Sequence, residues 1–178
     1  MKEDKNTPLD LEVLTEGMGG LTPAMGEVMA ECASVCLEER GHRSGILLRV
    51  SGAFAFSCRL RWPNTTEQMR RCHNDREVAT ENGAYGIAIL LVRKETGYKA
   101  LERSMKGGGF DYWVGKDAAL PFQYKARLEV SGIRLGDERD LSAKVREKVE
   151  QTRKSDGKFP AYVVVVEFGS PKASVVKR

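Results

Sequence analysis

Residues 107–132, GGGFDYWVGKDAALPFQYKARLEVSG, contain the pattern on which the predicted fold depends. We expect two strands here, at 110–114 and 126–131. The first is aromatic and bounded by glycines, and the second alternates apolar with polar side chains. Successive side chains of a strand point to opposite faces. Glu129 therefore lies on the polar face of its strand, and Asp111 points away from the aromatic rings beside it. The stretch predicts a hairpin with one carboxylate from each strand on the same side.

Two interpretations of this polar side are open. Antiparallel sheets commonly bury one face and expose the other, so these side chains can simply be solvated. Alternatively, the two carboxylates hold a divalent cation, for which carboxylate oxygens are suitable ligands. The second interpretation makes the hairpin a candidate metal site.

Length and composition favour one soluble globular domain. The chain has 178 residues, 41% of them hydrophobic, which is enough to bury a core. A net charge of +4 permits an anionic partner without requiring one. The four cysteines are scattered without zinc-ligand spacing, which is typical of a reducing compartment. The polar N-terminus lacks a signal-peptide pattern, and no apolar run is long enough to cross a membrane. We therefore expect a cytoplasmic protein without a membrane partner.

The chain is expected to divide into a lead-in and one domain. Residues 1–20 end in Glu-Gly-Met-Gly-Gly and are predicted to be a flexible N-terminal lead-in, or an arm that packs late. Residues 21–178 form the globular domain. Within it, 21–63 are expected to be a helix followed by a β-hairpin, and 64–178 to be the main core.

Within that core, a helix is expected to begin at Arg76 and to be followed by three strands, a helix and a last strand. Glycines at positions 83 and 86 of the first helix suggest that another element approaches it closely. The last strand, 162–166, is apolar on both faces, which indicates a central position. The class predicted from this order is α+β with an α/β-like core, in which helices flank a central mixed sheet.

This order, and the acidic residues in it, resemble the PD-(D/E)xK nuclease superfamily over about residues 66–168. In that superfamily a first helix often supplies a Glu, the second strand an Asp, and the third strand an acidic residue followed two positions later by Lys. The matching residues are Glu81 (or Glu77), Asp111 and Glu129. The resemblance implies a restriction-endonuclease-like αβββαβ core with an N-terminal helix and hairpin added. It also implies Mg²⁺ held by Glu81, Asp111 and Glu129.

The motif departs from the superfamily pattern at two positions. Phe110 replaces the usual proline, and Ser131 stands where the lysine is expected. Hydrolysis of a phosphodiester needs a group that orients water and offsets transition-state charge, and serine supplies no charge. Lys125 lies on the same strand face as Glu129 and is the candidate catalytic cation. Lys106, in the glycine-rich loop before the hairpin, is another.

Basic side chains near these positions are candidates for nucleic-acid contacts. Arg59 and Arg61 share the outer face of an N-terminal strand, where they can meet phosphates or simply be solvated. Lys106 and Arg127 are further candidates, the latter from the strand of Glu129.

Three functions are compatible with these features. The first is Mg²⁺-dependent hydrolysis of DNA in a bacterial defence or mobile-element setting, with Asp111, Glu129 and Lys125 as catalytic residues. The second is a nuclease fold without activity that serves as a binding or assembly subunit among the protein subunits of a larger complex. The third is an unrelated α+β interaction protein. Divalent metal binding at the two carboxylates separates the first from the others.

Overall fold

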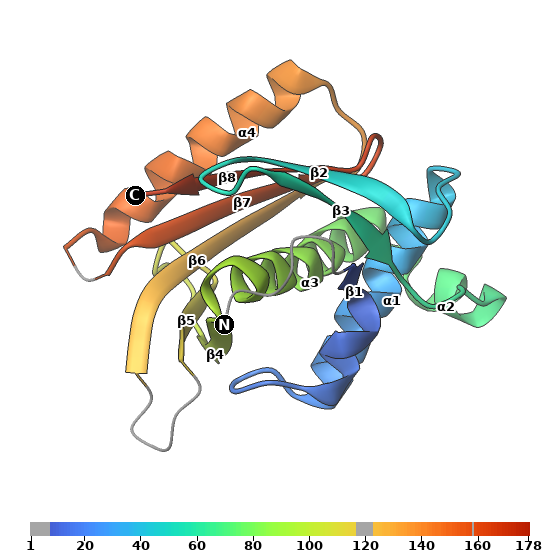
Figure 1. The fold of residues 1–178 in the computed structure, drawn as a ribbon, viewed down its shortest axis with the longest axis horizontal. Helices are drawn as coiled ribbons and strands as arrows, with labels where there is room; N and C mark the ends of the chain where they lie inside the picture. The colour runs from blue at the N-terminus through green and yellow to red at the C-terminus, as the bar shows by residue number, and fades with distance from the viewer. Residues whose placement is uncertain (1–7, 117–122, 158) are drawn as a thin grey trace.

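The computed structural model describes residues 8–116, 123–157 and 159–178, and these form an α+β structure around a curled mixed sheet (Figure 1). The predicted class is thus confirmed. Eight strands among the described residues make one sheet in the order β1-β3-β2-β8-β7-β6-β5-β4. Their bounds are β1 Leu9–Asp10, β2 Ile46–Gly52, β3 Phe56–Arg61, β4 Lys99–Arg103, β5 Tyr112–Lys116, β6 Gln123–Ile133, β7 Ala161–Glu167 and β8 Lys172–Lys177.

Helices cover both faces of this sheet (Figure 1). The long helix α3 packs against β6 and β7 on one face, α1 crosses α3, and α4 packs over β6, β7 and β8 on the other face. The α-helices are α1 Pro23–Glu39, α2 Glu67–Cys72, α3 Arg76–Thr96 and α4 Glu138–Gln151, and the 3₁₀ helices are η1 Leu11–Glu16 and η2 Thr152–Ser155. Among the described residues, no helix is both long and apolar enough to span a membrane.

The second part of the chain follows the predicted order of elements: α3, β4, β5, β6, α4, β7. Strands β4, β5 and β6 pair antiparallel in turn, and β7 lies parallel to β6 after the crossover through α4. Every residue of β7 is buried, as expected for a strand covered on both faces. This topology places β6 between α3 and α4, both of which contact it.

Local sequence explains where α3 begins and how it packs. The Asp75 side chain accepts hydrogen bonds from the backbone of the first turn, and Gly97 ends the helix with a φ of 72°. A Cβ atom at Gly83 would lie 2.8 Å from Ala33 Cα, so α1 and α3 touch backbone to backbone there. The predicted close approach at the α3 glycines is confirmed.

Residues 8–20 are packed against the domain, as in the second of the two alternatives for the N-terminal lead-in, an arm that packs onto the rest. Leu11 and Leu14 of η1 are fully buried, and β1 pairs with the edge of β3. The backbone N–H of Gly20 donates to the carbonyl of Ala100 in β4, at 2.9 Å. This segment fills the space beside α1 and α3 with leucines, and it is too short to show a helical period in the sequence. Residues 1–7 lie outside the described residues.

The strand β8 unites the N-terminal hairpin with the rest of the sheet. It pairs antiparallel with β7 and parallel with β2, so the sheet runs without a break from residues 46–61 to the core. Within this strand the buried Ala173 and Val175 alternate with more exposed side chains. The hairpin is therefore an integral part of the sheet and no separate addition.

Candidate functional site

The structure brings Asp111 and Glu129 together. Tyr112, the first residue of β5, pairs with Leu128 of β6. Asp111 immediately precedes one partner and Glu129 immediately follows the other, so the antiparallel register places them opposite each other. Strand β5 begins two residues later than predicted. Asp111, which precedes it, still bonds to the neighbouring strand, because its Oδ2 accepts the N–H of Val130 at 2.8 Å.

A lysine from α4 accompanies this carboxylate pair. The Nζ of Lys148 lies 2.8 Å from Glu129 Oε1 and also donates to Gln151 Oε1 at 3.1 Å. The Glu129 side chain is only 1% exposed and that of Lys148 18% exposed. The sequence does carry a signal for Lys148, since it follows the buried Leu141 by seven residues and so lies on the inward face of the helix. The cation beside Glu129 is therefore Lys148.

Burial governs the protonation of the pair. The pKa of Glu129 is raised to about 7, first by burial and then by the negative charge of Asp111, against the lowering effect of Lys148. Burial also raises the pKa of Asp111, against the hydrogen bonds that its carboxylate accepts. Glu129 more than offsets the lowering effect of burial on Lys148, whose pKa is raised. Among the described residues, the buried Oε2 of Glu129 has no hydrogen-bond partner. The site thus carries an unsatisfied carboxylate oxygen.

The raised pKa of Glu129 predicts a stability that falls with pH. Because the folded protein binds this proton more tightly than the unfolded chain, the stabilisation is complete below the ordinary glutamate pKa and is lost as pH rises through about 7. We expect the free energy of unfolding in EDTA to drop by on the order of 2 kcal/mol between about pH 5 and pH 8 through this group, since one pKa unit is about 1.4 kcal/mol. Urea unfolding at several pH values measures it. Glu129→Gln should remove this part of the slope, and identical slopes in both proteins would contradict the assignment.

Glu81 joins the cluster from α3 through a tyrosine. The hydroxyl of Tyr85 lies 2.7 Å from Glu81 Oε1 and 2.9 Å from Asp111 Oδ1. A phenol has one proton to donate, so it satisfies only one of these carboxylates at a time. Burial, followed by the charge of Asp111, raises the pKa of Tyr85 and keeps that proton in place. The three predicted acidic residues thus belong to one cluster, with more acceptors than donors.

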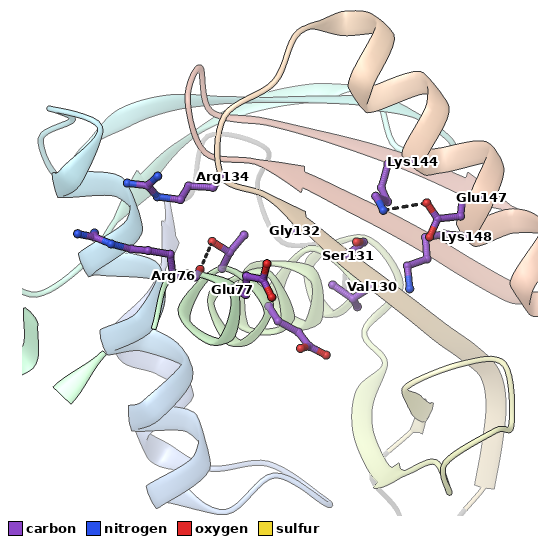
Figure 2. A pocket seen from close by; sticks show the side chains of 11 residues that line it. Arg76, Glu77, Val130, Ser131, Gly132, Arg134, Lys144, Glu147 and Lys148 are labelled. Carbon is purple, nitrogen blue, oxygen red and sulfur yellow. Dashed lines mark hydrogen bonds and ion pairs between the residues drawn. The ribbon is translucent and has the colours of Figure 1, made fainter. Parts of the chain in front are cut away.

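Two cavities adjoin the cluster and share Glu81 in their walls. The first, of about 490 Å³, is called the α4 cavity: Arg76 and Arg134 lie on one side of it, and Lys144 and Lys148 of α4 on the other (Figure 2). The second, of about 450 Å³, is called the loop cavity, because the β4–β5 loop bounds it. The α4 cavity thus reaches Glu81 and Lys148, the loop cavity reaches Glu81 and Asp111, and Glu129 lines neither of the two.

The remaining predicted site residues lie in different places. Lys106 lines the loop cavity. Lys125 is exposed on β6, and its place beside Glu129 is taken by Lys148. Arg59 and Arg61 are exposed on β3, which four strands separate from β5.

Arg127 lies inside the protein, although the pattern placed it on a polar face. It is 2% exposed, and its guanidinium donates to the carbonyls of Phe159 and Thr152 and to the hydroxyl of Ser155. These bonds tie β6 to η2 and to the segment before β7. The Arg127 side chain is thus out of reach of a nucleic acid, because η2 covers this part of the sheet face.

The donor set of the site fits a hard divalent cation. Mg²⁺ is usually held by one or two carboxylates together with water and substrate phosphates. Asp111 and Glu129 supply two adjacent carboxylates, and the buried Oε2 of Glu129 has no hydrogen-bond partner among the described residues. Within the described part of the chain, no group of three or more Asp, Glu, His or Cys side chains is arranged to hold a metal. The fit is thus to a cation that shares its coordination with water or substrate.

Comparisons with known proteins add no assignment. Neither the family models nor the curated proteins nor the solved structures that were searched gave a significant match to this chain. The function must therefore be argued from the geometry of the site.

Proposed function

We propose that this protein is a Mg²⁺-dependent phosphodiester hydrolase acting on DNA, built on a restriction-endonuclease-like αβββαβ core from α3 to β7. The observation that carries the proposal is the 2.8 Å contact between Lys148 Nζ and Glu129 Oε1. The resemblance to PD-(D/E)xK nucleases is weakest at Ser131, where the motif has lysine. Lys148 supplies an ammonium to the same carboxylate from the neighbouring helix, which supports a site with a relocated lysine.

Each residue of the cluster has a role that its contacts suggest. Asp111 and Glu129 would hold the cation, with Glu81 nearby on α3. When bound, Mg²⁺ would polarise the phosphoryl group and stabilise the negative charge that develops on it. Lys148 would orient the attacking water and offset transition-state charge. Tyr85 fixes the Asp111 carboxylate by a hydrogen bond of 2.9 Å.

The direct test is cleavage of DNA by the purified protein with and without divalent metal. We expect supercoiled plasmid, or a labelled oligonucleotide duplex, to be cut in Mg²⁺ or Mn²⁺ and to remain intact in EDTA. We also expect the midpoint of thermal unfolding to rise with Mg²⁺ at about pH 8, because the cation relieves repulsion between buried carboxylates. A protein that neither binds a divalent metal nor cuts single- or double-stranded DNA would refute the proposal.

One observation favours the second candidate, an inactive nuclease fold that binds other macromolecules. Lys148 already neutralises one oxygen of Glu129 in a buried ion pair, and the described residues lack a three-ligand metal group. In that case the pair would serve to hold α4 on the sheet. Metal-independent DNA binding without cleavage would support this candidate, and a metal-dependent cleavage activity would exclude it.

A further inference from the structure

The loop cavity is lined by three cationic side chains from separate segments. Arg103 ends β4, Lys106 lies in the β4–β5 loop, and Lys154 belongs to η2. The carboxylates of Glu81 and Asp111 lie in the same wall. The cavity therefore has cationic groups beside the carboxylates that are the candidate metal ligands.

Among the described residues, the three cations of the loop cavity form no ion pair with an acidic side chain, although the charge of Arg103 lowers the pKa of Asp111. Arg103 donates to the neutral hydroxyl of Tyr112 at 2.8 Å and lies over the rings of Tyr85 and Tyr112. In the part of the chain that the structure describes, neither Lys106 nor Lys154 has an ion pair, and both are exposed. Positive side chains that form no ion pair attract an anion from solution.

The cations of the α4 cavity differ in this respect. Arg76 and Arg134 both pair with Glu39, and Lys144 pairs with Glu147 at 2.8 Å. Most of the positive charge on that side is already neutralised within the protein. The two cavities thus differ in how much of their positive charge is paired, and the loop cavity is the one equipped to bind an anion.

The loop itself is held against the end of α4. Gly107 and Gly109 have φ values of 90° and 78°, and a Cβ at Gly109 would lie 2.7 Å from the carbonyl oxygen of Gln151 and 3.2 Å from Lys154 Cβ. Only glycine allows both the conformation and the contact. This packing brings the loop that carries Lys106 against the segment that carries Lys154, so the two ammonium groups belong to one cavity.

We propose that the loop cavity is a phosphate-binding subsite, in which Arg103, Lys106 and Lys154 hold the phosphate of a nucleotide next to the one placed at Asp111 and Glu129. This inference rests on the proposed function, because it takes a polynucleotide as the ligand. A volume of about 450 Å³ is within the range of small-molecule sites and suits one nucleotide. The substrate is then a polynucleotide whose backbone enters on the β4–β5 side of the carboxylates.

The test measures binding of a fluorescein-labelled 12-nucleotide DNA single strand by anisotropy, in EDTA and at several salt concentrations. We expect Lys106→Gln/Lys154→Gln to weaken binding about tenfold and to reduce the slope of log affinity against log salt by about 0.7, the contribution of one phosphate contact on a single strand. The control is Arg146→Gln/Arg153→Gln, which removes the same charge from exposed positions of α4 and η2 outside both cavities. It should change affinity less than twofold.

Three outcomes would overturn the subsite. These are equal losses in both double variants, no loss in either, and displacement of the strand by inorganic phosphate as effectively as by a dinucleotide, which would make the ligand a free phosphate. The measurement needs neither metal nor cleavage, so its result is separable from that of the proposed function. If the protein does not cleave DNA and only the lysine double variant loses binding, the subsite is retained and the hydrolase is not. Metal-dependent cleavage with unchanged binding would retain the hydrolase and remove the subsite.

Discussion

Lys148→Gln is expected to reduce metal-dependent DNA cleavage by about 10²–10³-fold while the protein remains folded. That range is typical for removal of one group that stabilises transition-state charge. Lys148 is the ammonium in contact with Glu129, and glutamine keeps a polar head of similar reach without the charge. Initial cleavage rates with saturating Mg²⁺ measure the effect.

The control for this variant is Lys125→Gln, which removes the same charge from an exposed position on the strand of Glu129. It should cleave at nearly the wild-type rate, whereas the strand pattern alone would have made it the damaging change. Removing one partner of a buried pair also lowers stability, here by about 2 kcal/mol because Lys148 is partly exposed. Lys148→Arg, which keeps a positive charge, should recover part of the activity. Full activity in Lys148→Gln, or equal losses in both glutamine variants, would sink the assigned role.

Asp111→Asn is expected to lower cleavage by on the order of 10³-fold and at the same time to raise stability without metal. An asparagine oxygen can still accept the N–H of Val130, so the local backbone is retained. Removal of the charge takes away one cause of the raised pKa of Glu129. The variant should therefore unfold at a higher temperature than the wild type in EDTA at about pH 8, and should gain less from added Mg²⁺.

Asp111→Asn is informative because we expect its cleavage activity to fall while its stability rises. Substitution of a residue that only holds the strands together would lower both activity and stability. Glu150→Gln removes one carboxylate from the exposed face of α4 and should alter neither measurement. Loss of stability in Asp111→Asn, or a Mg²⁺ response equal to that of the wild type, would show that Asp111 is part of the scaffold and not a metal ligand.

The acidic part of the site was predictable because it follows from local rules. Strand alternation and a hairpin register are enough to place Asp111 beside Glu129. The glycines of α3 predicted that another element packs closely against this helix. The partner of Glu129 was not predictable from its own strand, because Lys148 reaches it across the crossover between β6 and β7. Helical spacing from Leu141 marked Lys148 as inward-facing, but only the topology determines which carboxylate it meets.

Side-chain pattern was misleading where another element covers a polar face. Arg127 shares a face with Glu129, yet η2 lies over it and supplies carbonyl acceptors to its guanidinium. The same reason accounts for the N-terminal segment: Leu11 and Leu14 are buried because η1 packs against α1 and α3. Likewise, residues 172–177 become a central strand because β7 and β2 pair with them on either side.

The position of β8 has a consequence for how the protein is made. During synthesis, β2 and β3 leave the ribosome early and can form their hairpin, and β4 to β7 follow as a second group. The two groups share no strand pairing until residues 172–177 emerge and insert between β2 and β7. Until then the nascent chain exposes two unpaired strand edges, one on each group, which are surfaces prone to misassociation. Completion of the sheet therefore comes after the carboxylate-bearing strands β5 and β6 have been synthesised.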